Sequence, residues 1–285
     1  MKKTVKIISL ILAVIIAALP FTCSFATEKK LNYVVIGDSI GFGAGIVNPD
    51  EACYGKIVAD TNGYNYKNLS VNGYNTDALL SHMKLPSVKE AIEEADIISL
   101  SIGGNDFLTS NMVKLCGEAA FLNDYSSFDE ISEKFYENYC KIISEIKSLN
   151  PDAVILAQTL YNPMYNAARD IYQAGADRLN AGYRRYLKEN PDSIVIVDVG
   201  KAFEGHEEYI ANDCIHPNAA GNVEIAKLVL RTLKNLKLGE KTTPVINNAG
   251  ADNNLIWGYK ILLEAATNYI MFIAKTISPI LTAII

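Results

Sequence analysis

This sequence contains a serine and an aspartate–histidine pair whose side chains could act together as a nucleophile and its base. Ser39 lies in the segment Gly-Asp-Ser-Ile-Gly at residues 37–41, where small neighbours could present its hydroxyl to a cleft. Among the three histidines of the chain, only His216 stands three residues after an aspartate, Asp213. An aspartate that orients a histidine allows the imidazole to take the proton of a serine hydroxyl. The three side chains together predict a nucleophilic serine that performs acyl transfer.

Acyl transfer also needs hydrogen-bond donors for the oxyanion of the tetrahedral intermediate. Asn105, in the segment Gly-Gly-Asn-Asp at residues 103–106, can offer its side-chain N–H, and Gly73 can bring a bare backbone N–H close to a ligand. The N–H of Ser39 is the third candidate, because it lies at the expected start of a helix, where unpaired donors favour an anion. We therefore expect an oxyanion hole made of Ser39, Gly73 and Asn105.

Short β-branched runs alternate with longer helical patterns from residue 31 to about residue 238. Several of the runs are apolar throughout, as in a parallel sheet covered by helices on both faces. The expected strands are Tyr33–Ile36, Tyr64–Leu69, Ile97–Ile102, Val154–Gln158 and Ile194–Val197. The expected helices cover roughly residues 53–61, 75–94, 128–149, 166–189 and 218–237. This pattern predicts an α/β fold, a three-layer α/β/α sandwich around a doubly wound, flavodoxin-like parallel sheet.

The candidate site residues all follow expected strands. Ligand sites in open parallel sheets lie beyond the carboxyl ends of the strands. Ser39 follows the first expected strand, Gly73 the second and Asn105 the third, while Asp213 and His216 come after the last. The predicted fold would therefore gather these distant residues at one edge of the sheet.

The four segments resemble those of the GDSL, or SGNH, hydrolase family, and they occur in the family's order across residues 31–238. The match consists of Gly-Asp-Ser at 37–39, a glycine at 73, Gly-Gly-Asn-Asp at 103–106 and Asp-x-x-His at 213–216, with Ile40 in the place of the family's leucine. The resemblance implies that Ser39 attacks an ester carbonyl, with His216 as general base and Asp213 orienting it. It further implies a serine esterase or lipase, a carboxylic ester hydrolase that forms an acyl-enzyme and needs no metal or organic cofactor.

Residues 1–26 have the pattern of a secretory signal peptide. Three lysines accompany an apolar run, Ile7–Leu19, that is short for a membrane span. The small-x-small sequence Ser-Phe-Ala at 24–26 predicts cleavage after Ala26. We expect a secreted protein, with an uncleaved N-terminal anchor as the alternative.

The charge and the cysteine content of the chain argue against some classes of ligand. Without its leader the chain carries 23 basic and 32 acidic residues and has no basic stripe, which argues against nucleic-acid binding. An exported protein could form disulfides, and the pairing of four cysteines stays open. Their spacing, without a Cys-x-x-Cys or a nearby histidine pair, argues against a zinc site. These cysteines are Cys53, Cys116, Cys140 and Cys214.

Two further segments follow the predicted catalytic domain at residues 27–238. Residues 239–254 have the composition of a polar linker, and residues 255–285 form an apolar tail with helical amphipathicity. The tail could contact a membrane or cell envelope, pack on the catalytic domain or in an oligomer, or span the bilayer as an anchor. Glu264 and Lys275 weigh against a simple span, and Pro279 would kink its end.

Two other functions stay open at this point. One is a carbohydrate O-deacetylase of the same family, and the other is a non-catalytic module that binds a membrane or envelope. The expected ligand is a small-molecule, lipid or carbohydrate ester. Of the remaining polar residues, His82 and His206 are expected at the surface, and Asp38 is expected to brace the serine turn.

Overall fold

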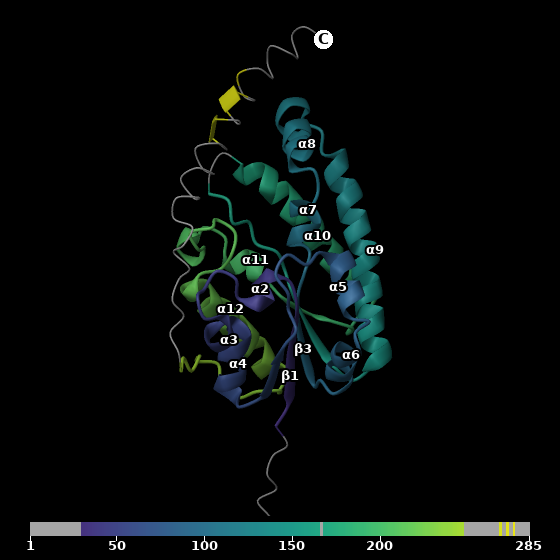
Figure 1. Ribbon diagram of the computed structural model, residues 1–285, viewed down its shortest axis with the longest axis vertical. Helices are drawn as coiled ribbons and strands as arrows, with labels where there is room; N and C mark the ends of the chain where they lie inside the picture. The colour runs from purple at the N-terminus through teal and green to yellow at the C-terminus, as the bar shows by residue number, and fades with distance from the viewer. Residues whose placement is uncertain (1–29, 166–167, 248–267, 270–271, 274–275, 277–285) are drawn as a thin grey trace, which may run out of the picture. The chain divides into compact units, whose positions relative to one another are not determined.

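The computed structural model describes residues 30–165, 168–247, 268, 269, 272, 273 and 276. Within the compact unit Leu31–Ile285, the described residues include five parallel strands in one sheet, in the order β2-β1-β3-β4-β5 (Figure 1). This is the flavodoxin-like order of doubly wound folds, and it confirms the predicted fold class. The strands are β1 (Asn32–Gly37), β2 (Asn65–Asn68), β3 (Ile97–Ser101), β4 (Val154–Gln158) and β5 (Val195–Val197).

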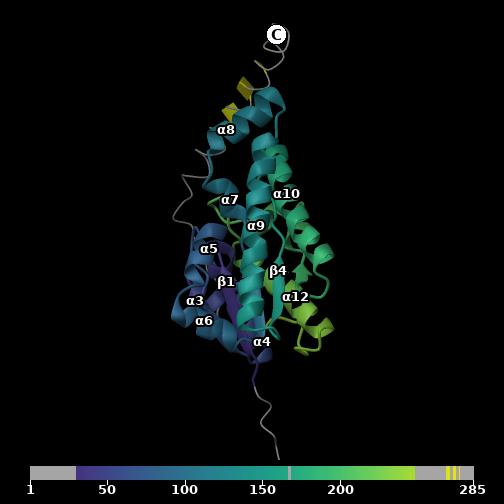
Figure 2. The same ribbon diagram turned by 90° about the vertical axis from the view of Figure 1, so that its right-hand side faces the viewer.

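Both faces of the sheet are buried. In the central strand β1, Val34 and Ile36 face one hydrophobic core, while Tyr33 and Val35 face the other. The first core is covered by α5 (Thr76–His82), α6 (Pro86–Glu93), α9 (Ser126–Leu149) and α10 (Arg169–Glu189). The second core is covered by α4 (Tyr54–Asn62), α11 (Val199–Ala202) and α12 (Ala219–Asn235). Helix α9 crosses the foreground of Figure 2, in front of the sheet. Two-sided burial accounts for the apolar character of the central strands.

One long helical pattern is interrupted. Residues 75–94 form two helices, α5 and α6, rather than the single helix that the sequence predicts. Pro86 is the first residue of α6, and Leu85 before it has an extended backbone. Proline has no N–H to donate to the preceding turn and disfavours a helical residue before it, so α5 ends and a new helix begins.

The segment between β3 and α9 forms short helices that sequence periodicity does not predict. These helices are α7 (Gly104–Leu108), α8 (Met112–Gly117) and the π-helical η1 (Glu118–Leu122). Further short helices are α2 (Ser39–Phe42), α3 (Pro49–Ala52) and η2 (Glu207–Tyr209). Residues 104–122, which hold α7, α8 and η1, join the carboxyl edge of the sheet to the start of α9. They lie beside the strand ends where the site residues are expected, and some of them line the pocket described below.

Three further predictions from the sequence can be compared with the structure, those on the cysteines, on membrane-spanning helices and on the two ends of the chain. Cys53, Cys116, Cys140 and Cys214 are all free thiols, so the structure shows no disulfide among the described residues. None of the helices described is long and apolar enough to cross a membrane. The predicted signal peptide lies outside the described residues, and so does the apolar tail apart from a few positions.

Candidate active site

Ser39 is the first residue of α2 and follows β1 directly. Gly37 makes this turn possible, because its φ is +138° and a Cβ there would lie 1.8 Å from the carbonyl oxygen of Ser101, at the end of β3. The N–H of Asp38 donates to that same oxygen at 2.9 Å. The end of β1 thus runs against the end of β3, and Ser39 lies at the carboxyl edge of the sheet, where the sequence predicts it.

Asp38 is the N-terminal cap of α2. Its Oδ1 accepts hydrogen bonds from the N–H of Ile40 at 3.0 Å and from the Ser101 hydroxyl at 3.1 Å, and Ser101 Oγ accepts from the N–H of Gly41 at 3.0 Å. Burial raises the pKa of Asp38 to about 7, although these hydrogen bonds and the charge of His216 act in the opposite direction. Asp38 therefore braces the serine turn, as expected.

His216 and Asp213, which the sequence predicts to act together, are hydrogen-bonded to each other. His216 Nδ1 lies 2.6 Å from Asp213 Oδ2, and Asp213 Oδ1 accepts the backbone N–H groups of Ile215 and His216, both at 2.9 Å. Burial would raise the pKa of Asp213, but the hydrogen bond and charge of His216 and the two N–H groups together hold it below its usual value. A carboxylate on Nδ1 selects the tautomer whose Nε2 can accept a proton.

Two contacts hold the His216 turn beside the serine turn. Gly45, in the loop after α2, lies so close to it that a Cβ there would be 2.1 Å from the carbonyl oxygen of Pro217 and 3.1 Å from His216 Cβ. Asn222 of α12 accepts from the N–H of Tyr54 at 3.0 Å and donates to the Pro217 carbonyl at 3.1 Å. These contacts join the segment after β1 to the segment that leads into α12, and they do so at the site.

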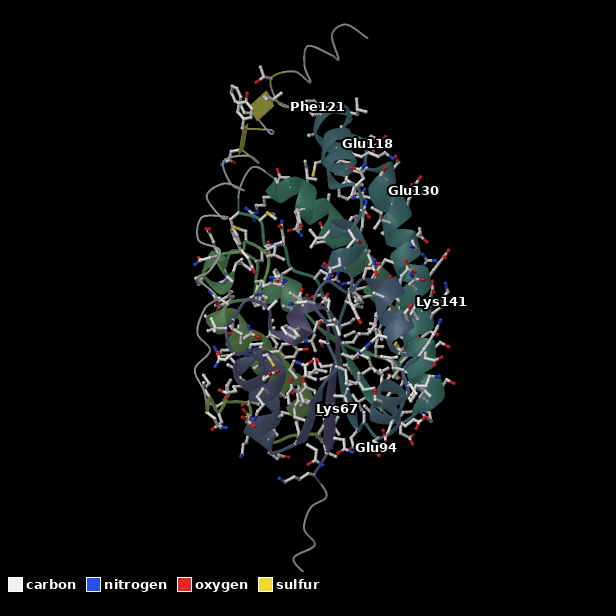
Figure 3. All side chains as sticks on the ribbon, in the orientation of Figure 1. Lys67, Glu94, Glu118, Phe121, Glu130 and Lys141 are labelled. Carbon is white, nitrogen blue, oxygen red and sulfur yellow. The ribbon has the colours of Figure 1, made fainter. Side chains whose placement is uncertain are left out.

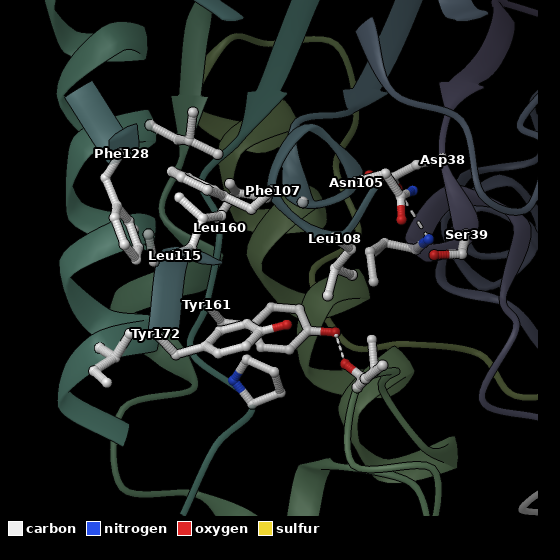
Figure 4. Close-up of a pocket in the computed structure, with 18 residues that line it drawn as sticks. Asp38, Ser39, Asn105, Phe107, Leu108, Leu115, Phe128, Leu160, Tyr161 and Tyr172 are labelled. Atoms are coloured by element: carbon white, nitrogen blue, oxygen red, sulfur yellow. Dashed lines mark hydrogen bonds between the residues drawn. The ribbon is translucent and has the colours of Figure 1, made fainter. Parts of the chain in front are cut away.

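The serine and histidine turns border the same pocket. Ser39 and Ile215 both line it, and the hydroxyl of Tyr161 donates to the Ile215 carbonyl at 2.6 Å, as Figure 4 shows. Within the described residues Ser39 and His216 are not hydrogen-bonded to each other. In ligand-free hydrolases this contact often shortens only when substrate is bound.

Asn105 lies in α7 and joins the second and third sequence segments. Its Nδ2 donates to the carbonyl of Tyr74 at 2.9 Å. An amide nitrogen carries two hydrogens, so one remains for a ligand. Gly73, next to Tyr74, has a φ of +79°, a left-handed conformation in which other residues are strained. The structure therefore places the loop of Gly73 against Asn105, and both Asn105 and Ser39 line the pocket.

A second link between the same two segments could not be foreseen from the sequence. Asp106 Oδ1 accepts the Thr76 hydroxyl at 2.5 Å, and Asp106 Oδ2 accepts the Thr76 N–H at 3.2 Å. Asn138 of α9 also donates to Thr76 Oγ1 at 3.1 Å. Burial raises the pKa of Asp106 above its usual value, against the hydrogen bonds from Thr76. In the sequence, only the position of Asp106 directly after Asn105 hints at this contact. Nothing in the sequence singles out Thr76 as its partner.

The pocket itself is deep and mostly apolar. It has an empty volume of about 770 Å³, part of which is open to solvent. Figure 4 shows Ser39 and Asn105 at one end and Leu115, Phe128 and Tyr172 at the other. The lining residues are Asp38, Ser39, Ile40, Gly104, Asn105, Phe107, Leu108, Leu115, Phe128, Leu160, Tyr161, Pro163, Ile171, Tyr172, Gly175, Ala176, Leu179 and Ile215. The sequence indicates only the polar end of this pocket.

The other two histidines differ from each other. His206 is exposed, lies 2.6 Å from Glu208 through Nδ1 and stacks on Tyr209, which confirms the expected surface position. His82 is half-buried rather than a surface residue, because its ring packs edge-on against Tyr74 with centroids 5.3 Å apart. No histidine is among the lining residues of the pocket beside Ser39, and the turn of His216 reaches the pocket through Ile215. Figure 3 shows the described side chains on the whole ribbon, in the orientation of Figure 1.

The doubly wound sheet, with a serine turn after β1 and a hydrogen-bonded Asp–His pair before α12, has the arrangement of an α/β/α hydrolase. Residues 35–223 match the GDSL-like lipase/acylhydrolase family, and the chain belongs to this family. It is accordingly a carboxylic ester hydrolase, as the sequence predicts.

Relatives and solved structures agree with this assignment. The protein YpmR of Bacillus subtilis (strain 168) is 29% identical over 222 residues, 73% of this chain and 83% of that protein. The spore germination lipase LipC of Bacillus licheniformis is 28% identical over 209 residues, 67% of this chain and 91% of its own. The crystal structure of the lipase Lip_vut3 from a goat rumen metagenome shares the fold, with a TM-score of 0.57 at 23% identity over 70% of this chain and 96% of that one.

Proposed function

We propose that Ser39, His216 and Asp213 form the catalytic triad of a serine ester hydrolase, with the N–H groups of Ser39 and Gly73 and the side chain of Asn105 as the oxyanion hole. The observation that carries the proposal is the His216–Asp213 hydrogen bond of 2.6 Å on a turn packed against the Ser39 loop. It leaves Nε2 of His216 as the base that a serine nucleophile needs.

The reaction follows from this arrangement. Nε2 of His216 accepts the proton of Ser39 Oγ as this oxygen bonds to the ester carbonyl carbon, and the carbonyl electron pair becomes an oxyanion. Collapse of the intermediate breaks the bond to the alcohol oxygen, which takes the proton from His216 and leaves an acyl-serine. Water then gives a proton to His216, attacks the acyl carbon and releases the acid, while Ser39 regains its proton. The net reaction is ester plus water to acid plus alcohol.

The pocket favours an esterase or lipase over the two alternatives. A deacetylase needs room for only two acyl carbons, whereas this pocket extends from Ser39 to Leu115 and Phe128 and is walled by apolar side chains. A non-catalytic module would need no pocket that opens beside a serine braced in this way.

A fluorophosphonate probe tests the nucleophile. Because the probe phosphonylates only activated serines, wild-type protein should gain one phosphonyl group by mass, and Ser39→Ala should gain none. The matched control is Ser81→Ala, which removes an exposed hydroxyl of α5 that bonds only the Asp77 carbonyl and should leave labelling unchanged. Equal labelling of the wild type and Ser39→Ala would exclude Ser39 as the nucleophile.

We also propose that the protein is exported and that residues 255–285 bring it to a membrane or cell envelope. The support is the leader-like pattern of residues 1–26 and the amphipathic composition of the tail. Secreted protein should begin at Thr27, and the full-length mature chain should co-sediment with liposomes more strongly than a chain ending at Leu238. Equal sedimentation of the two chains would contradict the role of the tail, and an intact leader would contradict its cleavage.

A further inference from the structure

The end of the pocket opposite Ser39 is lined by buried side chains. Leu115 and Phe128 lie there in Figure 4, with 2% and 4% of their surface exposed. At the other end are Ser39 and Asn105, where the acyl carbonyl would react (Figure 4). A chain that enters beside Ser39 therefore has a fixed length of apolar space before it meets a wall.

One residue at this wall is a glycine in the interior of a helix. Gly175 lies on α10 with Ile171 and Leu179 one turn on either side, and all three line the pocket. Glycine disfavours helix interiors relative to alanine because it loses more backbone freedom on folding. Its presence therefore requires a reason beyond secondary structure.

Neither backbone conformation nor crowding supplies that reason. The φ of Gly175 is not in the left-handed region, and a Cβ there would lie 3.4 Å from ring atoms of both Phe107 and Phe128, which is ordinary van der Waals contact. Gly37 differs, since a Cβ at that position would overlap the Ser101 carbonyl at 1.8 Å. Gly175, Phe107 and Phe128 all line the pocket, so a side chain at position 175 would fill pocket space beside the two aromatic rings.

We propose that Gly175 sets the length of the acyl chain that the enzyme accepts, by leaving the part of the pocket beside the Phe107 and Phe128 rings open to the end of a long, unbranched chain. This inference rests on the proposed reaction at Ser39, since it assumes that the acyl group lies in this pocket. It assigns Gly175 a role in specificity and none in the chemical step.

The size of the effect can be stated. Burial of each methylene group contributes about a fourfold gain in kcat/KM while the chain extends along apolar wall. Activity on p-nitrophenyl esters should therefore rise with chain length and level off once the chain reaches Gly175. The side chain of Gly175→Leu occupies the terminal space, so the longest accepted chains should lose about 50-fold in kcat/KM, the equivalent of some three methylenes. Butyrate, which does not reach position 175, should change by less than about twofold, by the same reasoning.

The control is Ala174→Leu, the same kind of enlargement on the adjacent residue of α10, which does not line the pocket. Its chain-length profile should match the wild type. Gly175→Ala provides a second, milder variant that keeps the test valid if the leucine variant folds poorly. It should lose about fourfold on the longest chains only, while its thermal midpoint rises because alanine favours the helix.

The outcomes separate this inference from the proposed reaction. A Gly175→Leu enzyme that loses short and long esters equally, or keeps the wild-type profile, would overturn the role of Gly175 and leave Ser39 untouched. Undiminished hydrolysis by Ser39→Ala would instead overturn the reaction. A shift of the optimum to shorter chains in both Gly175 variants, and not in Ala174→Leu, supports the inference.

Discussion

Replacement of His216 by alanine should lower kcat by about 10⁶-fold, and addition of Ser39→Ala to that variant should cost almost nothing more. The reason is that the two side chains act in one step. Without the base at Nε2, Ser39 Oγ keeps its proton and is a poor nucleophile, so removal of either group removes the same step. Steady-state kinetics of the two single variants and the double variant on one soluble ester measure this directly.

Two comparisons sharpen the test. Asp213→Asn should lower kcat by about 10⁴-fold, less than His216→Ala, because the imidazole remains but loses the partner that fixes its tautomer. His206→Ala removes an exposed histidine that pairs with Glu208, and it should leave kcat unchanged. Independent, multiplying losses in the Ser39 and His216 variants would show that the two residues do not act as a pair.

Replacement of Asn105 by alanine should lower kcat by about 10²–10³-fold with little change in KM. One amide hydrogen of Asn105 is used by the Tyr74 carbonyl, and the other is free for the oxyanion, which exists only in the transition state and intermediate. An interaction that strengthens only there changes kcat rather than ground-state binding. The same kinetic assay, with kcat and KM determined separately, provides the measurement.

Asn105 also holds the Gly73 loop in place. A control must therefore separate its hydrogen bond to the oxyanion from its effect on the position of that loop. Thr76→Val keeps the shape of the side chain but removes the hydroxyl that donates to Asp106, which loosens the same loop and leaves Asn105 in place. Its loss of kcat should be clearly smaller than that of Asn105→Ala. Equal losses in the two variants would mean that Asn105 acts only by holding the loop.

The sheet can be predicted from sequence because its strands are buried on both sides. The predicted bounds of β4, Val154–Gln158, agree with the structure at both ends, and Pro151 and Asp152 mark the turn that precedes it. The edge strand β2 is half exposed and runs from Asn65 to Asn68, inside the predicted Tyr64–Leu69. Strand order then follows from the doubly wound pattern, and each of the predicted site residues lies on the segment after its strand.

The walls of the pocket could not be predicted in the same way. Helices α7 and α8 are too short to show a periodic apolar face, and they are stabilised by distant contacts such as that of Phe107 with Phe128, whose ring centroids lie 5.3 Å apart. The position of Gly175 on the pocket wall cannot be predicted from the sequence either, because a glycine in a helical pattern indicates only a less stable helix. Its surroundings come from α7 and α9, which only the fold brings together.

The bond between Tyr54 and Asn222 has a consequence for how this protein becomes active. It joins residues 168 positions apart, and the His216 turn reaches Ser39 only when α12 has docked on α4. Contacts of such long sequence separation form late and slowly, because the intervening chain must first lose its freedom. A nascent chain that has completed β1, β3 and β4 already holds Ser39 and Asn105 but lacks His216, the proposed base. We therefore expect hydrolysis to be the last property that the folding chain acquires.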